Sequence, residues 1–150
     1  MAALVRRAAT AALVALLGGA ALVPVALARP AYREAAVRQF GYPGSLLNRS
    51  TMSCTFCHVS ERGGAPWNVF GEELRGALRE RPGARFPEVL HGVLARDLDA
   101  DCDGYADALE VFARTLPGDP DSHPTEAEAA LRTRFEAAGG ADLYRPKAAK

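Results

Sequence analysis

Apolar residues recur three and four positions apart along much of this chain, a spacing that predicts short helices rather than strands. The best-defined segment follows Asn68, a favourable N-cap residue, and ends at the turn "RPG" at 81–83. Its apolar face consists of Phe70, Leu74, Ala77 and Leu78. The pattern therefore predicts a helix between Asn68 and this turn, with one face in the protein core.

Two further helices are predicted on either side of this segment. After Pro30, "AYREAAVRQF" is expected to form a short helix that ends at Gly41. Its apolar side consists of Tyr32, Ala36 and Phe40. A third helix begins near Pro87 and runs through "EVLHGVLARDL". Its buried side consists of Val89, Leu90, Val93 and Leu94.

Two C-terminal helices complete the prediction. A short helix covers about 108–115, and the last helix begins at a capping box formed by Thr125 and Glu128 and ends at Gly139. Residues 140–150 are expected to be a loose tail. The predicted fold class is therefore all-α.

The N-terminal segment has the pattern of a secretory signal peptide. Arg6 and Arg7 precede a short apolar run that ends in the small-x-small pattern Ala26-Leu27-Ala28. Cleavage is expected after Ala28, which leaves one small domain with no membrane span. The predicted location is the periplasm or the extracellular space.

The sequence "CTFCH" places Cys54 and Cys57 three positions apart, with His58 directly after them. In this spacing two thiols can add to the two vinyl groups of one porphyrin, and the imidazole can bind its iron. Haem attachment to c-type proteins takes place outside the cytoplasm, in agreement with a signal peptide. A redox dithiol is a minority alternative, because no buried strand leads into the cysteines. A zinc site is less favoured, since Cys102, His91 and His123 are isolated.

The segment resembles the small exported monohaem c-type cytochromes of bacteria, in which Cys-x-x-Cys-His is followed by Gly-Gly and then Asn-x-Phe-Gly. The matching positions are Cys54, Cys57, His58, Gly63, Gly64, Asn68, Phe70 and Gly71. The resemblance implies a covalent haem c on Cys54 and Cys57, with His58 as the proximal iron ligand. It also implies single-electron transfer with a protein redox partner, rather than enzymatic catalysis. Trp67 is a candidate donor to a haem propionate.

The sixth iron ligand is left open by the sequence. Met52 lies only two residues before Cys54, too close to reach the opposite face of the iron. His91, on the third helix, is slightly favoured over His123, which precedes a proline in a loop. If neither histidine binds, the iron is five-coordinate or carries water, and the alternative function is a haem-based sensor or a weak peroxidase.

An acidic segment carries the second motif. Residues 97–128 contain ten acidic residues and one arginine, a balance that favours a bound cation. "DLDADCDGYADALE" has the spacing of an EF-hand loop, with Gly104 at its sixth position. The expected calcium ligands are Asp99, Asp101, Asp103, the Tyr105 carbonyl, Asp107 and Glu110. The loop also resembles the single calcium loops of bacterial thrombospondin type 3-like repeats, and without a second loop a structural ion is expected.

The predicted organisation is a small helical cytochrome c-like domain fused to one EF-hand-like helix-loop-helix. Its parts are the signal peptide (1–28), the haem-binding region (29–85), the calcium-binding region (86–123), the C-terminal helix (124–139) and the tail (140–150). A purely structural calcium-binding module is the third alternative. Dispersed basic residues without interleaved aromatic residues argue against a nucleic-acid partner. Cys102 is either a free thiol or a link between two chains.

Overall fold

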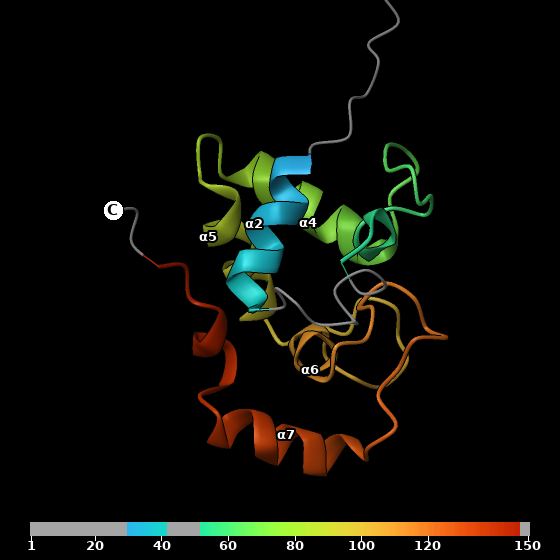
Figure 1. The fold of residues 1–150 in the computed structure, drawn as a ribbon, viewed down its shortest axis with the longest axis vertical. Coiled ribbons are helices and arrows are strands. Elements are labelled where there is room, and N and C mark those ends of the chain that lie inside the picture. The colour runs from blue at the N-terminus through green and yellow to red at the C-terminus, as the bar shows by residue number, and fades with distance from the viewer. Residues whose placement is uncertain (1–29, 42–51, 148–150) are drawn as a thin grey trace, which may run out of the picture.

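The computed structural model describes residues 30–41 and 52–147, so the expected signal peptide lies outside the described residues (Figure 1). This part of the chain is helical and contains no strand, which confirms the all-α prediction. The α-helices are α2 (Pro30–Phe40), α4 (Val69–Glu80), α5 (Phe86–Leu94), α6 (Asp107–Ala113) and α7 (Glu128–Ala137). Two 3₁₀ helices, η1 and η2, cover Cys54–Phe56 and Gly140–Tyr144. No helix in these residues is both long and apolar enough to cross a bilayer.

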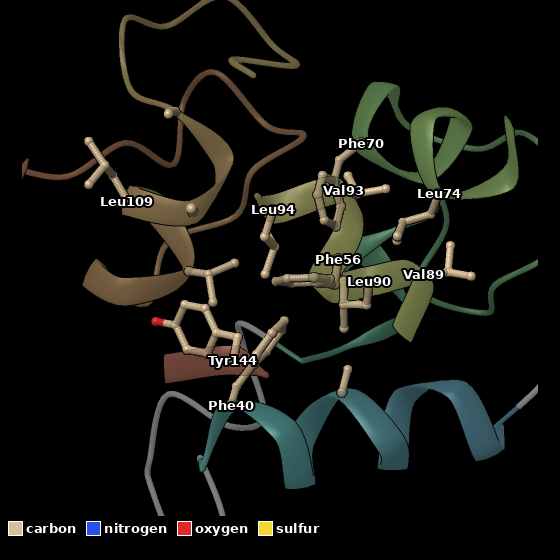
Figure 2. Close-up of a cluster of buried hydrophobic side chains, with 14 of the residues drawn as sticks. Phe40, Phe56, Phe70, Leu74, Val89, Leu90, Val93, Leu94, Leu109 and Tyr144 are labelled. Carbon is tan, nitrogen blue, oxygen red and sulfur yellow. The ribbon is translucent and has the colours of Figure 1, made fainter. Parts of the chain in front are cut away.

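The main hydrophobic core lies between α2, η1, α4 and α5 (Figure 2). Phe56, in the middle of the Cys-x-x-Cys turn, is 3% exposed. Its ring lies edge-on to that of Phe70, with centroids 5.4 Å apart, and 5.9 Å from the ring of Phe40. Leu74 of α4 and Leu90 of α5 continue this core. The turn that carries the cysteines is therefore anchored by its own aromatic residue.

Helix α4 has the limits that the sequence predicts, because both ends are set locally. The side chain of Asn68 accepts a hydrogen bond from the backbone N–H of Gly71 at 2.8 Å, and the helix ends at Glu80, before the "RPG" turn. The predicted apolar residues Phe70, Leu74 and Ala77 are buried.

Two predicted helix limits are wrong. Helix α5 ends at Leu94, because Asp97 adopts a left-handed backbone conformation with φ 53° and turns the chain toward the acidic loop. Helix α7 begins at Glu128 after Ala127, and the capping box with Thr125 does not form. Glu126 instead makes tertiary contacts: its carbonyl accepts from the Tyr105 hydroxyl at 2.8 Å, and its carboxylate pairs with Arg134.

The C-terminal segment is part of the fold and not the loose tail that the sequence predicts. Helix η2 packs against α2, α5 and α7. Tyr144 is 6% exposed, with its ring centroid 5.2 Å from that of Phe40 and 6.4 Å from that of Phe135. The Gln39 side-chain amide donates to the Tyr144 carbonyl at 2.7 Å. One buried aromatic residue therefore joins the two ends of the described chain.

Candidate haem cavity and calcium loop

The Cys-x-x-Cys-His segment forms a tight turn. The backbone N–H groups of Cys57 and His58 both donate to the Cys54 carbonyl, at 3.2 and 2.9 Å. The turn brings the side chains of Cys54, Cys57 and His58 to the wall of a single cavity. The three residues predicted to attach and ligate a haem therefore face one space.

The imidazole of His58 is oriented by a backbone carbonyl. Its Nδ1 lies 2.6 Å from the Gly64 carbonyl oxygen, and because a carbonyl only accepts, Nδ1 carries the proton. In the neutral imidazole Nε2 then has a free lone pair, the form that binds a metal. The Trp67 ring packs 4.1 Å from the His58 ring, and an isolated antiparallel bridge pairs the two residues.

The cavity beside this turn has a volume of about 970 Å³. This is at the upper end of the range for small-molecule and cofactor sites. Its apolar walls come from α2, η1, α4 and α5, and they include Ala36, Phe56, Leu74, Leu78, Phe86 and Leu90. Trp67 also lines it, and its contact with a haem propionate stays a prediction.

The sequence analysis missed the four arginines that line the cavity, which are Arg33, Arg75, Arg79 and Arg81. Guanidinium groups are well suited to pair with carboxylates such as haem propionates. The guanidinium of Arg75 also lies 5.8 Å from the centroid of the Trp67 ring. A signal was present in the sequence, because Arg75 and Arg79 follow the apolar Leu74 and Leu78 at the same helical spacing.

Helix α4 lies in direct contact with the Cys-x-x-Cys-His turn at 54–58, the candidate haem turn. A Cβ on Gly71 would lie 1.9 Å from the carbonyl oxygen of Cys57, so only glycine permits this approach. The Asn68 amide donates to the Thr55 carbonyl at 2.8 Å while its oxygen caps α4. The Asn-x-Phe-Gly residues therefore fix the turn against the helix that forms a wall of the cavity.

The second thiol of the Cys-x-x-Cys pair is a weak acid in this environment. Burial, with a smaller contribution from Cys54, raises the pKa of Cys57 from 9.0 to about 12. Only the thiolate is nucleophilic, so Cys57 in this environment is a poor nucleophile. In a redox dithiol the nucleophile is the first cysteine of the pair, so the redox-dithiol alternative stays open.

His91 and His123 lie within the described residues, and neither lines the cavity. His91 lies on α5 with its Nε2 3.7 Å from an Asp142 carboxylate oxygen, and its side chain is 20% exposed. The His123 ring stacks on that of Tyr105, with centroids 6.4 Å apart. Met52, by contrast, lines the cavity and is 1% exposed. Geometry therefore gives no support to His91 as the sixth ligand.

The acidic loop has the backbone arrangement of a cation-binding turn. Gly104 has φ 99°, and its N–H donates to a carboxylate oxygen of Asp99 at 3.0 Å. The N–H of Tyr105 donates to Asp103 at 2.9 Å, and that of Ala100 donates to Asp107 at 3.0 Å. These bonds use one oxygen of each of these carboxylates and leave the other for a ligand.

Those remaining oxygens lack any partner. The buried and unpartnered atoms are Asp99 Oδ1, Asp101 Oδ2, Asp103 Oδ2, Asp107 Oδ2 and Glu110 Oε2. Asp107 and Glu110 are 1% and 0% exposed. An ionised carboxylate is costly to bury without a counter-charge, and Ca²⁺ binds such oxygens in groups of six to eight. Each of the five carboxylates predicted from the sequence thus has an oxygen without a partner in the described residues, as a cation ligand requires.

Burial of these groups changes their acidity strongly. Burial, together with the neighbouring Asp101 and Asp103 carboxylates, raises the pKa of Glu110 from 4.5 to about 10. Burial, with the charges of Glu73 and Asp101 adding to it, raises the pKa of Asp107 from 3.8 to about 7. A bound divalent cation would remove this penalty, because it stabilises the ionised carboxylates.

Within the described residues, Asp99, Asp101 and Asp103 form the single cluster of three or more potential metal ligands whose ligand atoms lie within 4.8 Å of one another. Cys102 is exposed on this loop, apart from Cys54 and Cys57. Comparison of the chain with models of protein families, with curated proteins and with solved structures finds no match.

Proposed function

We propose that this protein is an exported c-type cytochrome, with one covalent haem c and one structural Ca²⁺, that exchanges single electrons with a protein partner. The observation that carries the proposal is the placement of Cys54, Cys57 and His58. They face one cavity of about 970 Å³, and the Gly64 carbonyl holds His58 in the tautomer that binds metal. The haem would supply the one-electron chemistry when bound.

The residues of the chain have distinct roles in this proposal. Cys54 and Cys57 hold the macrocycle through their sulfur atoms, and His58 Nε2 ligates the iron. The apolar side chains of α4 and α5 keep water from the ring, while the cavity arginines pair with its carboxylates. The buried carboxylates of the acidic loop hold the calcium ion, which fixes the chain between α5 and α6.

The deciding experiment is expression of the exported chain together with haem-attachment machinery. Wild type should gain the mass of one haem that survives denaturation, and it should show the absorption bands of a c-type cytochrome. The denatured and reduced protein should have one thiol available for alkylation, that of Cys102, out of three cysteines. A matched Cys54→Ala/Cys57→Ala variant should be colourless. Wild type with three free thiols and no haem mass would overturn the proposal.

A second candidate function is favoured by the position of the histidines. Because neither His91 nor His123 lines the cavity, a haem iron held there by His58 would have no histidine as its sixth ligand. An external ligand could then bind it, as in a haem-based sensor or a weak peroxidase. The ferrous protein should then show a shifted absorption spectrum on addition of carbon monoxide, equally in wild type and His91→Ala. No shift in wild type, with a shift in His91→Ala, would identify His91 as a ligand and exclude this candidate.

A further inference from the structure

Tyr105 has a central place in the acidic loop, because both its backbone and its side chain form hydrogen bonds. Its backbone N–H donates to Asp103 Oδ1 at 2.9 Å, and its carbonyl is one of the predicted calcium ligands. The next residue, Ala106, is 6% exposed, and its carbonyl accepts from the N–H groups of Leu109 and Glu110 in α6. The backbone at Tyr105 therefore links the carboxylates of the loop to α6.

The side chain of Tyr105 extends out of the loop and contacts the segment that precedes α7. Its hydroxyl donates to the backbone carbonyl of Glu126 at 2.8 Å. Its ring lies parallel to that of His123, with an interplanar angle of 6° and centroids 6.4 Å apart. The loop is thus joined, through this one side chain, to a segment 21 positions further along the chain.

The acceptor of this hydrogen bond is held in place by α7. The Glu126 carboxylate pairs with Arg134 at 2.6 Å, and the Arg134 guanidinium lies 5.4 Å from the centroid of the Phe112 ring on α6. Arg132, also on α7, donates to both carboxylate oxygens of Asp97 at 3.0 Å, just before the loop. Helix α7 packs on α6 (Figure 1). It therefore provides the Tyr105 hydroxyl with a fixed acceptor.

The loop needs such an anchor because its own charges act to open it. Five of its carboxylates each have a buried oxygen without a partner in the described residues. Like charges in a shared site repel each other, so without a cation the loop relaxes toward a more open form unless contacts outside it oppose this. A site that is held in its binding form before the ligand arrives binds more tightly, because less ordering is required on binding.

We propose that Tyr105 is a positioning residue of the calcium loop, which its hydroxyl holds in the closed form by donating to the Glu126 carbonyl. The inference rests on the calcium site of the proposed function. The affinity of the loop for calcium then depends on a contact with the C-terminal helix, outside the loop itself. Because such coupling is reciprocal, calcium in turn strengthens the packing of α7 on the loop and on α6.

The test compares the full haem-loaded chain of wild type with its Tyr105→Phe and Tyr32→Phe variants. Tyr105→Phe removes one hydroxyl and no charge. Tyr32→Phe is the matched control, on α2 with its ring stacked on that of Phe86. Calcium affinity is measured by competition with a chelating dye, and hydrogen exchange of the α7 amides is followed in calcium and in chelator. Tyr105→Phe should weaken calcium binding about 3- to 10-fold and reduce the calcium-dependent protection of α7, while Tyr32→Phe stays within about twofold of wild type.

A merely structural role for the Tyr105 hydroxyl predicts a different result. Tyr105→Phe would then lower the free energy of unfolding equally in calcium and in chelator, and the calcium affinity would not change. Wild-type affinity in Tyr105→Phe, or an equal loss of affinity in Tyr32→Phe, overturns the inference. If wild type binds no calcium, the proposed calcium site fails and the inference fails with it. A protein that binds calcium but carries no haem overturns the cytochrome proposal alone, since the comparison of calcium affinities still decides the role of Tyr105.

Discussion

Gly71 and Gly76 lie on the same helix, but their surroundings differ. A Cβ on Gly71 would lie 1.9 Å from the Cys57 carbonyl oxygen, whereas a Cβ on Gly76 would have no atom within 4 Å. We expect Gly71→Ala to push α4 away from the haem turn and cost about 1–3 kcal/mol, as overpacking does. Gly76→Ala should stabilise the protein by about 0.5–1 kcal/mol, because it removes backbone entropy from the unfolded chain.

Denaturant unfolding of the haem-loaded variants measures both changes, and the ratio of Soret to protein absorbance after purification reports haem attachment. Gly71→Ala should also lower this ratio, because the displaced carbonyl belongs to an attachment cysteine. Similar stability changes in the two variants would show that the helix and the turn are not in close contact.

The predicted site residues that the structure brings together lie within short stretches of chain. Cys54, Cys57 and His58 meet because one turn contains them, and the loop carboxylates meet because alternate positions around Gly104 face inward. His91 does not line the cavity, because its direction depends on how α5 packs against α2 and α4.

Helices with strong local end signals could be predicted well. Asn68 and the "RPG" turn fix α4, whereas α7 lost its predicted cap because Glu126 pairs with Tyr105 and Arg134. Helix η2 has only five residues, so it has no helical periodicity to detect. It follows Gly139 and begins at Gly140, and both glycines have positive φ. Local chemistry thus sets some boundaries, and tertiary contacts override it at others.

The loop before α6 should make the stability of the calcium-free protein depend on pH. The pKa values of Asp107 and Glu110 are raised to about 7 and about 10, from 3.8 and 4.5. An acid with a raised pKa binds its proton more tightly in the folded protein than in the unfolded chain. The free energy of unfolding in a chelator should therefore fall as the pH rises above about 4, and fall further until about pH 10.

Thermal unfolding at pH 5 and pH 8, in chelator and in calcium, checks this expectation. The stabilisation by calcium should be larger at pH 8, because the ion binds the deprotonated carboxylates. Glu110→Gln is the control, since it should weaken the pH dependence in chelator, leaving the part due to Asp107, and abolish the effect of calcium. Calcium-free protein that becomes more stable between pH 5 and pH 8 would contradict the buried, uncompensated state of these groups.

The two proposed sites share their supporting helices. Helix α5 belongs to the predicted calcium-binding region, 86–123, yet it packs on α2 and α4, and Phe86 and Leu90 line the haem cavity. Figure 2 shows Leu90 and Leu94 of α5 beside Phe56 of the haem turn. The motifs could be found from the sequence one at a time, but their common core depends on contacts between distant segments.

The contact between α2 and the C-terminal segment joins residues that are far apart in the sequence, since Gln39 and Tyr144 are 105 residues apart. Tyr144→Ala should remove a buried ring from between Phe40 and Phe135 and cost about 3 kcal/mol in the free energy of unfolding. The neighbouring Leu143 is 42% exposed, so Leu143→Ala should change stability by less than about 0.5 kcal/mol.

Urea unfolding of both variants is measured in the presence of calcium. The acidic loop before α6 then has the same calcium occupancy in both variants. Because Phe40 also contacts Phe56 of the haem turn, Tyr144→Ala should in addition speed proteolysis near the attachment cysteines. If the two variants were equally stable, the C-terminal segment would not belong to the core, and the two ends of the chain would be independent. If only Tyr144→Ala unfolds early, packing of η2 on α2 supports the Cys-x-x-Cys-His turn through the rings of Phe40 and Phe56.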